Sequence, residues 1–302
     1  MLSLIVANLL ILGSKGMLGS AVTKYFSRTS HKIFEANTSG VALIPSNFSL
    51  RFDINSQSPG DLNESIRDRL DYIINCTGLI KHKIDELDTG SIFSAVRINS
   101  EFPKVLSDYY KNSDTKIFQI ATDCVFTGMT GNYFEDSTHD ATDIYGTTKS
   151  KGEVIASNMM ILRCSIIGRE LNSHIEFMDW ILGQPRNTAL RGFTNHHWNG
   201  LTTYQFAKIV SGIIDSGSFR PGVHHILPSD DCSKFELMEL ICRGFGRNDI
   251  SVEAVESENF IDRRLSTRFP KINDDFWRNA GYDKPLSIKE MTIEYANWIR
   301  AK

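Results

Sequence analysis

The chain has 302 residues, 41% of them hydrophobic and 23% charged, which is the composition of an ordinary globular protein with a sizeable core. A net charge of −3 gives no indication of a general nucleic-acid or membrane surface, and no run reaches the ~18 apolar residues of a membrane helix. Five scattered cysteines without a Cys-x-x-Cys motif indicate reduced thiols in a cytoplasmic protein. We therefore expect neither a nucleic-acid nor a membrane partner.

Strand-like and helical stretches alternate along the first half of the chain. The apolar start, "MLSLIVANLLILG", lacks the basic region and cleavage site of a secretory signal and predicts a buried strand. Strand patterns follow at 32–36, 48–54, 71–78, 116–122 and 159–165, and helical patterns at 21–26, 91–110 and 145–155. This alternation predicts an α/β fold with a Rossmann-type, doubly wound parallel sheet covered on both faces.

The second half is less regular. It predicts helices at 175–182, 203–214 and 235–245, a strand at 224–228 and an irregular loop at 263–269. We interpret it as a smaller, mixed α/β C-terminal substrate lobe, with an approximate division into residues 1–168 and 169–302 that allows segments to interleave.

Three glycines form the pattern Gly-x-x-Gly-x-x-Gly directly after the first strand and at the start of a helix. They are Gly13, Gly16 and Gly19. A phosphate that approaches a helix N-terminus needs free backbone N–H groups and no Cβ in the way. The alternative is a tight strand-to-helix turn that merely requires glycine, but the strand, the helix and the alternation favour dinucleotide binding, NADP(H) or NAD(H).

The end of the second strand normally contacts the adenosine ribose, where a carboxylate suits a 2′-hydroxyl and a basic residue suits a 2′-phosphate. Glu35 lies too early in the strand for this role. Lys15, inside the glycine loop, offers a positive charge for a 2′-phosphate. The pattern therefore favours NADP(H) over NAD(H).

Two tyrosine–lysine pairs have the i, i+4 spacing that places both side chains on one helix face. Tyr204 and Lys208 lie in an amphipathic helix and are interpreted as a half-buried tyrosine with a surface lysine. Tyr145 and Lys149 instead follow a strand that ends at Thr122, where parallel sheets bind ligands. A tyrosine phenol has a pKa near 10, and an ammonium ~4 Å away is expected to lower that pKa toward neutrality.

Several motifs together resemble the extended short-chain dehydrogenase/reductases, and in particular the dTDP-4-dehydrorhamnose reductase-like group of nucleotide-sugar reductases. The motifs are the glycine loop, "NCTG" at 75–78, "IN" at 98–99, "ATDCVFTG" at 121–128 and "YGTTK" at 145–149. In the second half, "RCSIIG", "WNGLTTYQFAK" and "RRLSTRF" resemble substrate-lobe segments of that group.

The resemblance implies roles for individual residues. Thr122 would orient a substrate carbonyl, Tyr145 would protonate it, and Lys149 would lower the pKa of Tyr145 and hold the nicotinamide ribose. The resemblance also implies a set of cofactor contacts. They are Gly13, Ser14, Lys15, Gly16, Met17, Leu18, Gly19, Asp53, Ile54, Asn75, Cys76, Thr77, Gly78, Asn99, Ala121, Tyr145, Lys149, Cys164, Ser165 and Ile166. The implied substrate contacts are Asp123, Cys124, Trp198 and Arg263.

Some positions leave alternatives open. The related reductases usually have a tyrosine where this chain has Cys124, which is interpreted mainly as a small apolar filler. Arg263 and Arg264 either clamp a diphosphate or form a solvated basic loop, and Trp198 either lines the sugar pocket or packs in the core. The pairs at 196–197 and 224–225 are adjacent histidines whose side chains would point to opposite faces of a strand, so we expect no metal site.

The sequence thus predicts an NAD(P)H-dependent reductase of a nucleotide-diphosphate 4-keto-6-deoxy sugar. Alternatives are a nucleotide-sugar epimerase of the same superfamily and a non-catalytic, dinucleotide-binding regulatory subunit. A dehydratase is disfavoured because Cys124, rather than a second acidic residue, follows Asp123. Dimers are common in this superfamily, which leaves a homodimer open.

Overall fold

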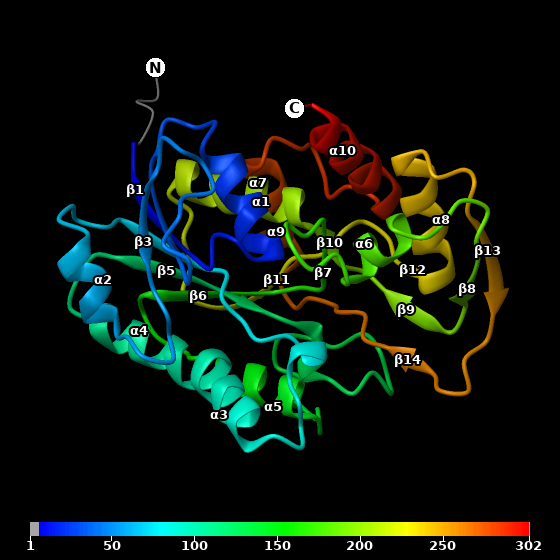
Figure 1. The fold of residues 1–302 in the computed structure, drawn as a ribbon, viewed down its shortest axis with the longest axis horizontal. Helices are drawn as coiled ribbons and strands as arrows, with labels where there is room; N and C mark the ends of the chain where they lie inside the picture. Colours follow the sequence, from blue (N-terminus) through cyan, green and yellow to red (C-terminus); the bar gives the residue numbers. More distant parts are fainter. Residues whose placement is uncertain (1–5, 302) are drawn as a thin grey trace.

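The computed structural model describes residues 6–301, so the first five residues of the predicted N-terminal strand lie outside the described residues. A seven-stranded sheet forms the centre of the molecule, in the order β11-β6-β5-β4-β1-β2-β3 (Figure 1). Every neighbouring pair in it is parallel. Its strands are β1 (Asn8–Leu12), β2 (Lys32–Asn37), β3 (Phe48–Arg51), β4 (Tyr72–Asn75), β5 (Lys116–Ala121), β6 (Met159–Arg163) and β11 (Gly222–His225).

Helices cover both faces of this sheet, which confirms the predicted doubly wound arrangement (Figure 1). The strands β4 and β6 are buried along their whole length, as their apolar sequences YIIN and MMILR require. One face carries α1 (Met17–Phe26), α7 (Thr203–Ser216) and α9 (Pro270–Asn279). The other carries α2 (Pro59–Ser65), α3 (Thr89–Ala95), α4 (Phe102–Tyr110) and α5 (Ile144–Lys151).

The second lobe is a mixed α/β layer beside the carboxyl ends of the strands (Figure 1). Its elements are β7 (Ile166–Ile167), α6 (Phe177–Leu182), β8 (Ala189–Phe193), β9 (His196–Trp198), β10 (Leu201–Thr202), β12 (Cys232–Ser233), α8 (Lys234–Phe245), β13 (Ser251–Val255), β14 (Ile261–Asp262) and α10 (Ile288–Arg300). Because β11 and α7 return to the main sheet, the lobes interleave along the chain. None of the helices within residues 6–301 is long and apolar enough to span a bilayer.

Several predicted boundaries differ from the structure. The strand predicted at 48–54 ends at Arg51, and the helix predicted to reach Ile155 ends at Lys151. The predicted helix at 91–110 is three pieces, because a π-helix at Val96–Glu101 separates α3 from α4. The strands β8 and β13, which pair with each other, were not predicted because β13 has no buried residue and β8 buries only Leu190 and Gly192, so neither has a continuous apolar run.

The π-helix and α5 pack backbone against backbone just behind the candidate site. Asn99, in the π-helix, donates from Nδ2 to Thr148 Oγ1 at 3.1 Å, and Ser100 Oγ donates to the Thr148 carbonyl at 2.8 Å. A Cβ on Gly152 would lie 1.9 Å from the Asn99 carbonyl oxygen. Glycine is therefore required at the end of α5, and its close approach fixes the position of the helix that carries Tyr145 and Lys149.

We predict that Gly152→Ala lowers the free energy of unfolding by about 3 kcal/mol, because the new methyl group collides with backbone that cannot move aside. Gly60→Ala is the matched control, since its Cβ would lie 3.4 Å from the nearest atom, Ser58 Oγ, and alanine favours the helix. Urea denaturation measures both variants. Equal stability of the two would contradict the close packing at Gly152.

Candidate active site

The glycine loop joins β1 to α1 and leaves the N-terminus of α1 open to an anion. Gly13 has a φ of +74°, and its carbonyl oxygen would lie only 2.1 Å from a Cβ on Gly19. The N-cap residue Gly16 supplies no side-chain acceptor, and the first turn, which includes Met17 and Leu18, has no acidic residue. The unpaired N–H groups of that turn therefore suit the pyrophosphate of a dinucleotide.

Basic and hydroxyl groups meet where β2 ends. Ser14 is fully buried and accepts a hydrogen bond from Asn37 Nδ2 at 3.0 Å. Lys15 Nζ donates to Ser39 Oγ at 2.9 Å, and Ser39 Oγ donates to Asn37 Oδ1 at 2.7 Å. Glu35 points elsewhere, because its carboxylate accepts the backbone N–H groups of residues 43 and 44. The prediction that Glu35 does not serve the ribose is consistent with these contacts.

The segment of Asp53 and Ile54, which the resemblance implies as a cofactor contact, lies against the π-helix. Arg97 Nε donates to the Ile54 carbonyl at 3.2 Å, and the Asp53 carboxylate accepts the Asn55 N–H at 3.0 Å. Asn75, at the end of β4, is fully buried and donates to Gln119 Oε1 at 2.7 Å. Its Oδ1 accepts from both the backbone and the hydroxyl of Thr77, so "NCTG" turns sharply beside the glycine loop.

Thr122 and Tyr145 meet at the carboxyl end of β5. Ala121 is the last residue of that strand, and Thr122 caps the short 3₁₀ turn at Asp123–Val125 by accepting the Cys124 N–H at 3.2 Å. The phenol of Tyr145, at the start of α5, lies near the Thr122 side chain. Burial raises the pKa of that phenol, the neighbouring Cys124 raises it further, and the Thr122 side chain lowers it. The phenol therefore stays protonated at neutral pH.

Lys149 is 7% exposed and points to the same end of the sheet. Its Nζ donates to the Ile120 carbonyl at 2.8 Å and lies 4.0 Å from the position of a Cβ on Gly78. Burial lowers the pKa of Lys149 to about 8, although Glu153 favours its charged form. The expectation that Lys149 lowers the pKa of Tyr145 is not met in this structure, because burial of the phenol dominates and raises that pKa.

Asn99 connects the loop after β4 to α5, the helix that contains Tyr145 and Lys149. Its Oδ1 accepts the Leu79 N–H and its Nδ2 donates to the Leu79 carbonyl, both at 2.9 Å. The same amide reaches Thr148 in α5. Asn99 thus positions the segment that contains Cys76 and Gly78 beside Lys149.

The segment after β6 borders the site on the lobe side. Cys164 is buried, and burial raises the pKa of its thiol. Ser165 Oγ accepts the indole N–H of Trp198 at 2.8 Å, and Ile166 begins β7. Trp198 is only 3% exposed and packs in the large core. This burial corresponds to the core position, which was one of the two alternatives for Trp198.

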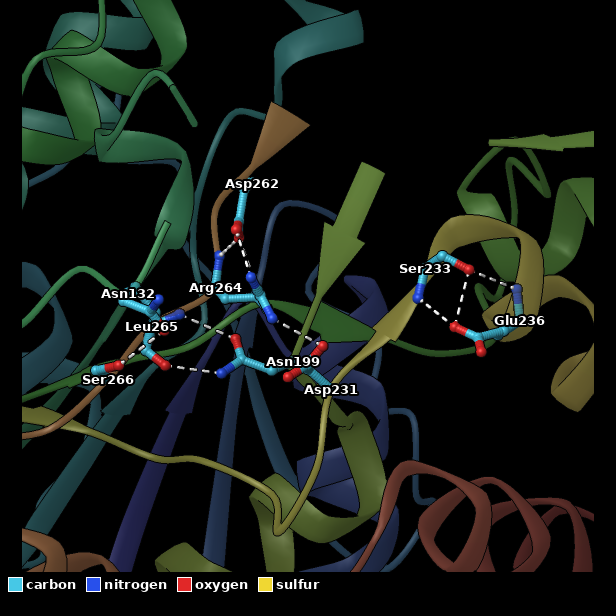
Figure 2. A network of polar contacts seen from close by, with 9 residues as sticks. All are labelled: Asn132, Asn199, Asp231, Ser233, Glu236, Asp262, Arg264, Leu265 and Ser266. Atoms are coloured by element: carbon cyan, nitrogen blue, oxygen red, sulfur yellow. Dashed lines mark hydrogen bonds and ion pairs between the residues drawn. The ribbon is translucent and has the colours of Figure 1, made fainter. Parts of the chain in front are cut away.

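Arg263 and Arg264 have different environments. Arg264 donates to Asp262 Oδ1 at 2.9 Å and to Asp231 Oδ1 at 3.0 Å, so both sides of its guanidinium are occupied (Figure 2). Arg263 donates only its Nε, to the Phe126 carbonyl at 2.8 Å. The charge of Arg263 acts on Asp123, whose pKa is raised by burial. Of the two arginines, Arg263 therefore faces the site and Arg264 braces the lobe.

The second tyrosine–lysine pair has only structural contacts. Tyr204 stacks on Trp298 with ring centroids 4.9 Å apart. Lys208 forms an ion pair with Glu294 at 3.2 Å and lies 3.9 Å above the ring of Tyr282. These contacts agree with a half-buried, structural Tyr204, but Lys208 is not the predicted surface lysine, because its side chain is only 18% exposed.

A buried cluster around Arg163 connects α5 to the lobe. The sequence did not suggest this cluster. Arg163 is 1% exposed, at the end of β6, and its guanidinium pairs with Glu153. It also donates to His225 Nε2 at 2.8 Å and to His139 Nε2 at 2.9 Å. Arginine has no acceptor, so both imidazoles must accept at Nε2 and carry their proton on Nδ1.

The Nδ1 contacts agree with that assignment. His225 Nδ1 donates to the Ser266 carbonyl at 2.6 Å, and His139 Nδ1 donates to Ser150 Oγ at 2.7 Å. Ser150 is the residue after Lys149, and Ser266 lies in the loop after Arg263. Burial, together with the charge of Arg163, lowers the pKa of His225 to about 4. Of the other three histidines noted in the sequence, His196 contacts the Asn259 carbonyl, His224 contacts the Arg220 carbonyl, and His197 packs against the ring of Phe260.

Comparison with known proteins agrees with this fold. The arrangement defines a Rossmann-type, extended short-chain dehydrogenase/reductase fold. The RmlD substrate binding domain family matches residues 7–287, and the chain belongs to that family. A dTDP-4-keto-6-deoxy-D-glucose reductase of Streptomyces niveus is 24% identical over 223 residues, covering 71% of this chain and 75% of that protein.

Solved structures show the same fold. A dTDP-4-dehydrorhamnose reductase of Clostridium acetobutylicum has a TM-score of 0.73 at 21% identity, covering 97% of this chain and 99% of its own. A dTDP-4-dehydrorhamnose reductase of Bacillus anthracis, in complex with NADP, has a TM-score of 0.75 at 17% identity, covering 98% and 100%. The dTDP-glucose 4,6-dehydratase of the same organism, with NAD, has a TM-score of 0.69 at 18% identity, covering 98% and 97%.

We predict that acid weakens the Arg163 cluster through His225. The unfolded chain binds a proton near pH 6.5 and the folded chain only near pH 4, so this stability is complete above pH 6.5 and is lost as the pH falls toward 4. The free energy of unfolding falls by about 3 kcal/mol over this range. His225→Gln does not show this loss, because it lacks the imidazole. The difference in unfolding free energy between wild type and His225→Gln should therefore narrow between pH 7 and pH 4 in urea titrations.

His196→Gln serves as the control for the substitution itself, because His196 contacts the Asn259 carbonyl and the ring of Phe193, outside the cluster. A constant difference between wild type and His225→Gln would contradict the assigned proton positions.

Proposed function

We propose that this protein is an NAD(P)-dependent oxidoreductase that uses NADPH to reduce the 4-keto group of a dTDP-linked 6-deoxy sugar. The observation that carries the proposal is the convergence of Thr122, Tyr145 and Lys149 at the carboxyl end of β5, beside the open N-terminus of α1. The substrate class is supported by the names of the related reductases. The five cysteines, all free, are in keeping with a cytoplasmic location.

The residues support a division of labour in the reduction. A bound nicotinamide supplies the hydride. Tyr145 donates the proton to the carbonyl oxygen, and its raised pKa keeps that proton in place until the oxygen gains negative charge. Thr122, whose side chain lies near the phenol, holds the same oxygen. Lys149, charged below about pH 8, then stabilises the phenolate that remains and donates to ribose hydroxyls.

The preference for NADPH rests on Lys15. Its ammonium lies at the end of β2 on Ser39, where the adenosine ribose of a Rossmann fold sits, and the nearby Asn37 is uncharged. The only carboxylate in β2, that of Glu35, is engaged by the loop at residues 43–47. A 2′-phosphate would thus meet a cation and hydroxyl donors, and no carboxylate of β2.

We predict that Tyr145→Phe reduces kcat by about 10²–10⁴-fold and leaves the Kd for NADPH within about twofold of wild type. The phenol supplies the proton but contributes little to cofactor affinity. Turnover is followed by NADPH absorbance at 340 nm with dTDP-4-keto-6-deoxy sugars, and binding by NADPH fluorescence.

Tyr204→Phe is the matched control and should keep wild-type turnover, because Tyr204 acts only by packing. Equal activity of Tyr145→Phe and wild type would contradict the proposed chemistry. A wild type that binds NADPH but reduces no nucleotide sugar would instead favour the regulatory-subunit alternative.

We predict that Lys15→Ala raises the KM for NADPH by about tenfold and changes the KM for NADH by less than about twofold, since only NADPH carries the 2′-phosphate. Steady-state kinetics with both cofactors measures this ratio. Lys24→Ala, in the last turn of α1, is the control. An equal effect of Lys15→Ala on both cofactors would contradict a 2′-phosphate contact.

A further inference from the structure

Lys234 is an unassigned cation beside the catalytic residues. It is the first residue of α8, so the lobe supplies it, whereas Thr122 directly follows β5 and Tyr145 lies in α5. Its ammonium lies 4.4 Å from the ring centroid of Phe177 and 5.6 Å from that of Trp198. Trp198 in turn donates its indole N–H to Ser165, in the segment after β6 that borders the site.

The charged neighbours of Lys234 also place it beside the candidate active site. Burial lowers the pKa of Lys234, while the charge of Asp123 raises it and that of Arg263 lowers it. The same two cations act on Asp123, where each opposes the effect of burial. Asp123, Lys234 and Arg263 therefore share one partly buried volume next to Thr122.

The Lys234 ammonium has no oxygen partner among residues 6–301: its contacts there are the two aromatic faces, and it makes no hydrogen bond or ion pair within 4 Å. Arg263 keeps both Nη groups without a hydrogen-bond acceptor in the same range. Arg263 also acts on the Asp143 carboxylate, but Asp143 forms an ion pair with Lys81 at 2.9 Å. Lys234 and Arg263 therefore leave one excess positive charge even when Asp123 is ionised. Desolvated cations without acceptors are suited to receive the oxygens of an anion.

The structure holds Lys234 in place through its neighbours. Ser233 and Glu236 form a capping box at the start of α8, and Asp231 pairs with Arg264 (Figure 2). The strand β12 pairs Cys232 and Ser233 with β9, whose last residue is Trp198. These bonds fix the backbone on both sides of Lys234, so its side chain loses little freedom when a ligand binds.

We propose that Lys234, together with Arg263, binds the diphosphate of the nucleotide-sugar substrate. This inference rests on the proposed function, because the diphosphate of such a substrate lies one sugar ring away from the C4 carbonyl that Thr122 and Tyr145 would hold. A diphosphate carries two negative charges in a nucleotide sugar, which complements the excess positive charge around Asp123. Arg264 is excluded from this role because Asp262 and Asp231 already occupy its guanidinium.

The test is isothermal titration calorimetry of the full-length protein with dTDP, UDP and NADPH as separate probes. Lys234→Met should weaken dTDP binding by about tenfold or more, and Lys234→Arg by less than about threefold, since arginine keeps the charge. NADPH binding should stay within about twofold of wild type for both variants. With substrate, Lys234→Met should raise the KM for the nucleotide sugar more than it lowers kcat.

Lys289→Met is the matched control, because Lys289 also lies in the first turn of a helix that begins with a capping box, α10, but it is exposed. It should bind every probe as the wild type does, and a thermal melt of each variant verifies folding. Unchanged dTDP affinity in Lys234→Met, or an equal loss of NADPH affinity, overturns the inference alone. A wild type that binds NADPH but neither dTDP nor UDP overturns the proposed substrate class and this inference with it.

Discussion

The buried guanidinium of Arg163 is the constraint on which the arrangement of the site depends. A charge that is 1% exposed is tolerated only when acceptors surround it, and here Glu153, His139 and His225 supply them. Each of these acceptors comes from a different part of the chain: the segment after α5, the loop before α5, and β11. Satisfying one arginine therefore fixes α5 relative to the sheet, and through the Ser266 carbonyl it also fixes the loop that begins at Arg263.

This arrangement gives the site a sheet side and a lobe side, which have different functions. The sheet side provides the uncapped N-terminus of α1 and the protonated phenol of Tyr145, which suit a dinucleotide and a proton transfer. The lobe side provides Arg263 and a second set of braces around Arg264, which hold β14 and the start of α8 together (Figure 2). Close backbone packing at Gly152 fixes α5 against the π-helix, so the helix that carries Tyr145 keeps its place on the sheet side.

The sheet side was predictable from the sequence and much of the lobe side was not. Short apolar runs and the glycine pattern produce a local signal, so β1, β4, β5 and β6 were predicted close to their true positions. The exposed strands β8 and β13 have no such signal. The contacts of Arg163 span up to 62 residues along the chain, and neither they nor Lys234 follow a motif. The opposite pKa shift of Tyr145 arises from burial, which spacing does not encode.

The central claim is that this protein transfers a hydride to the C4 carbonyl of a dTDP-linked sugar. The most direct measurement is a reaction of the wild type with NADPH deuterated at both C4 positions of the nicotinamide and an enzymatically generated dTDP-4-keto-6-deoxy sugar, followed by mass spectrometry and NMR of the sugar. The account predicts one deuterium per product molecule, bound to C4, and an equal amount of oxidised cofactor. A sugar that is changed without deuterium, or is not changed while NADPH binds, would contradict it.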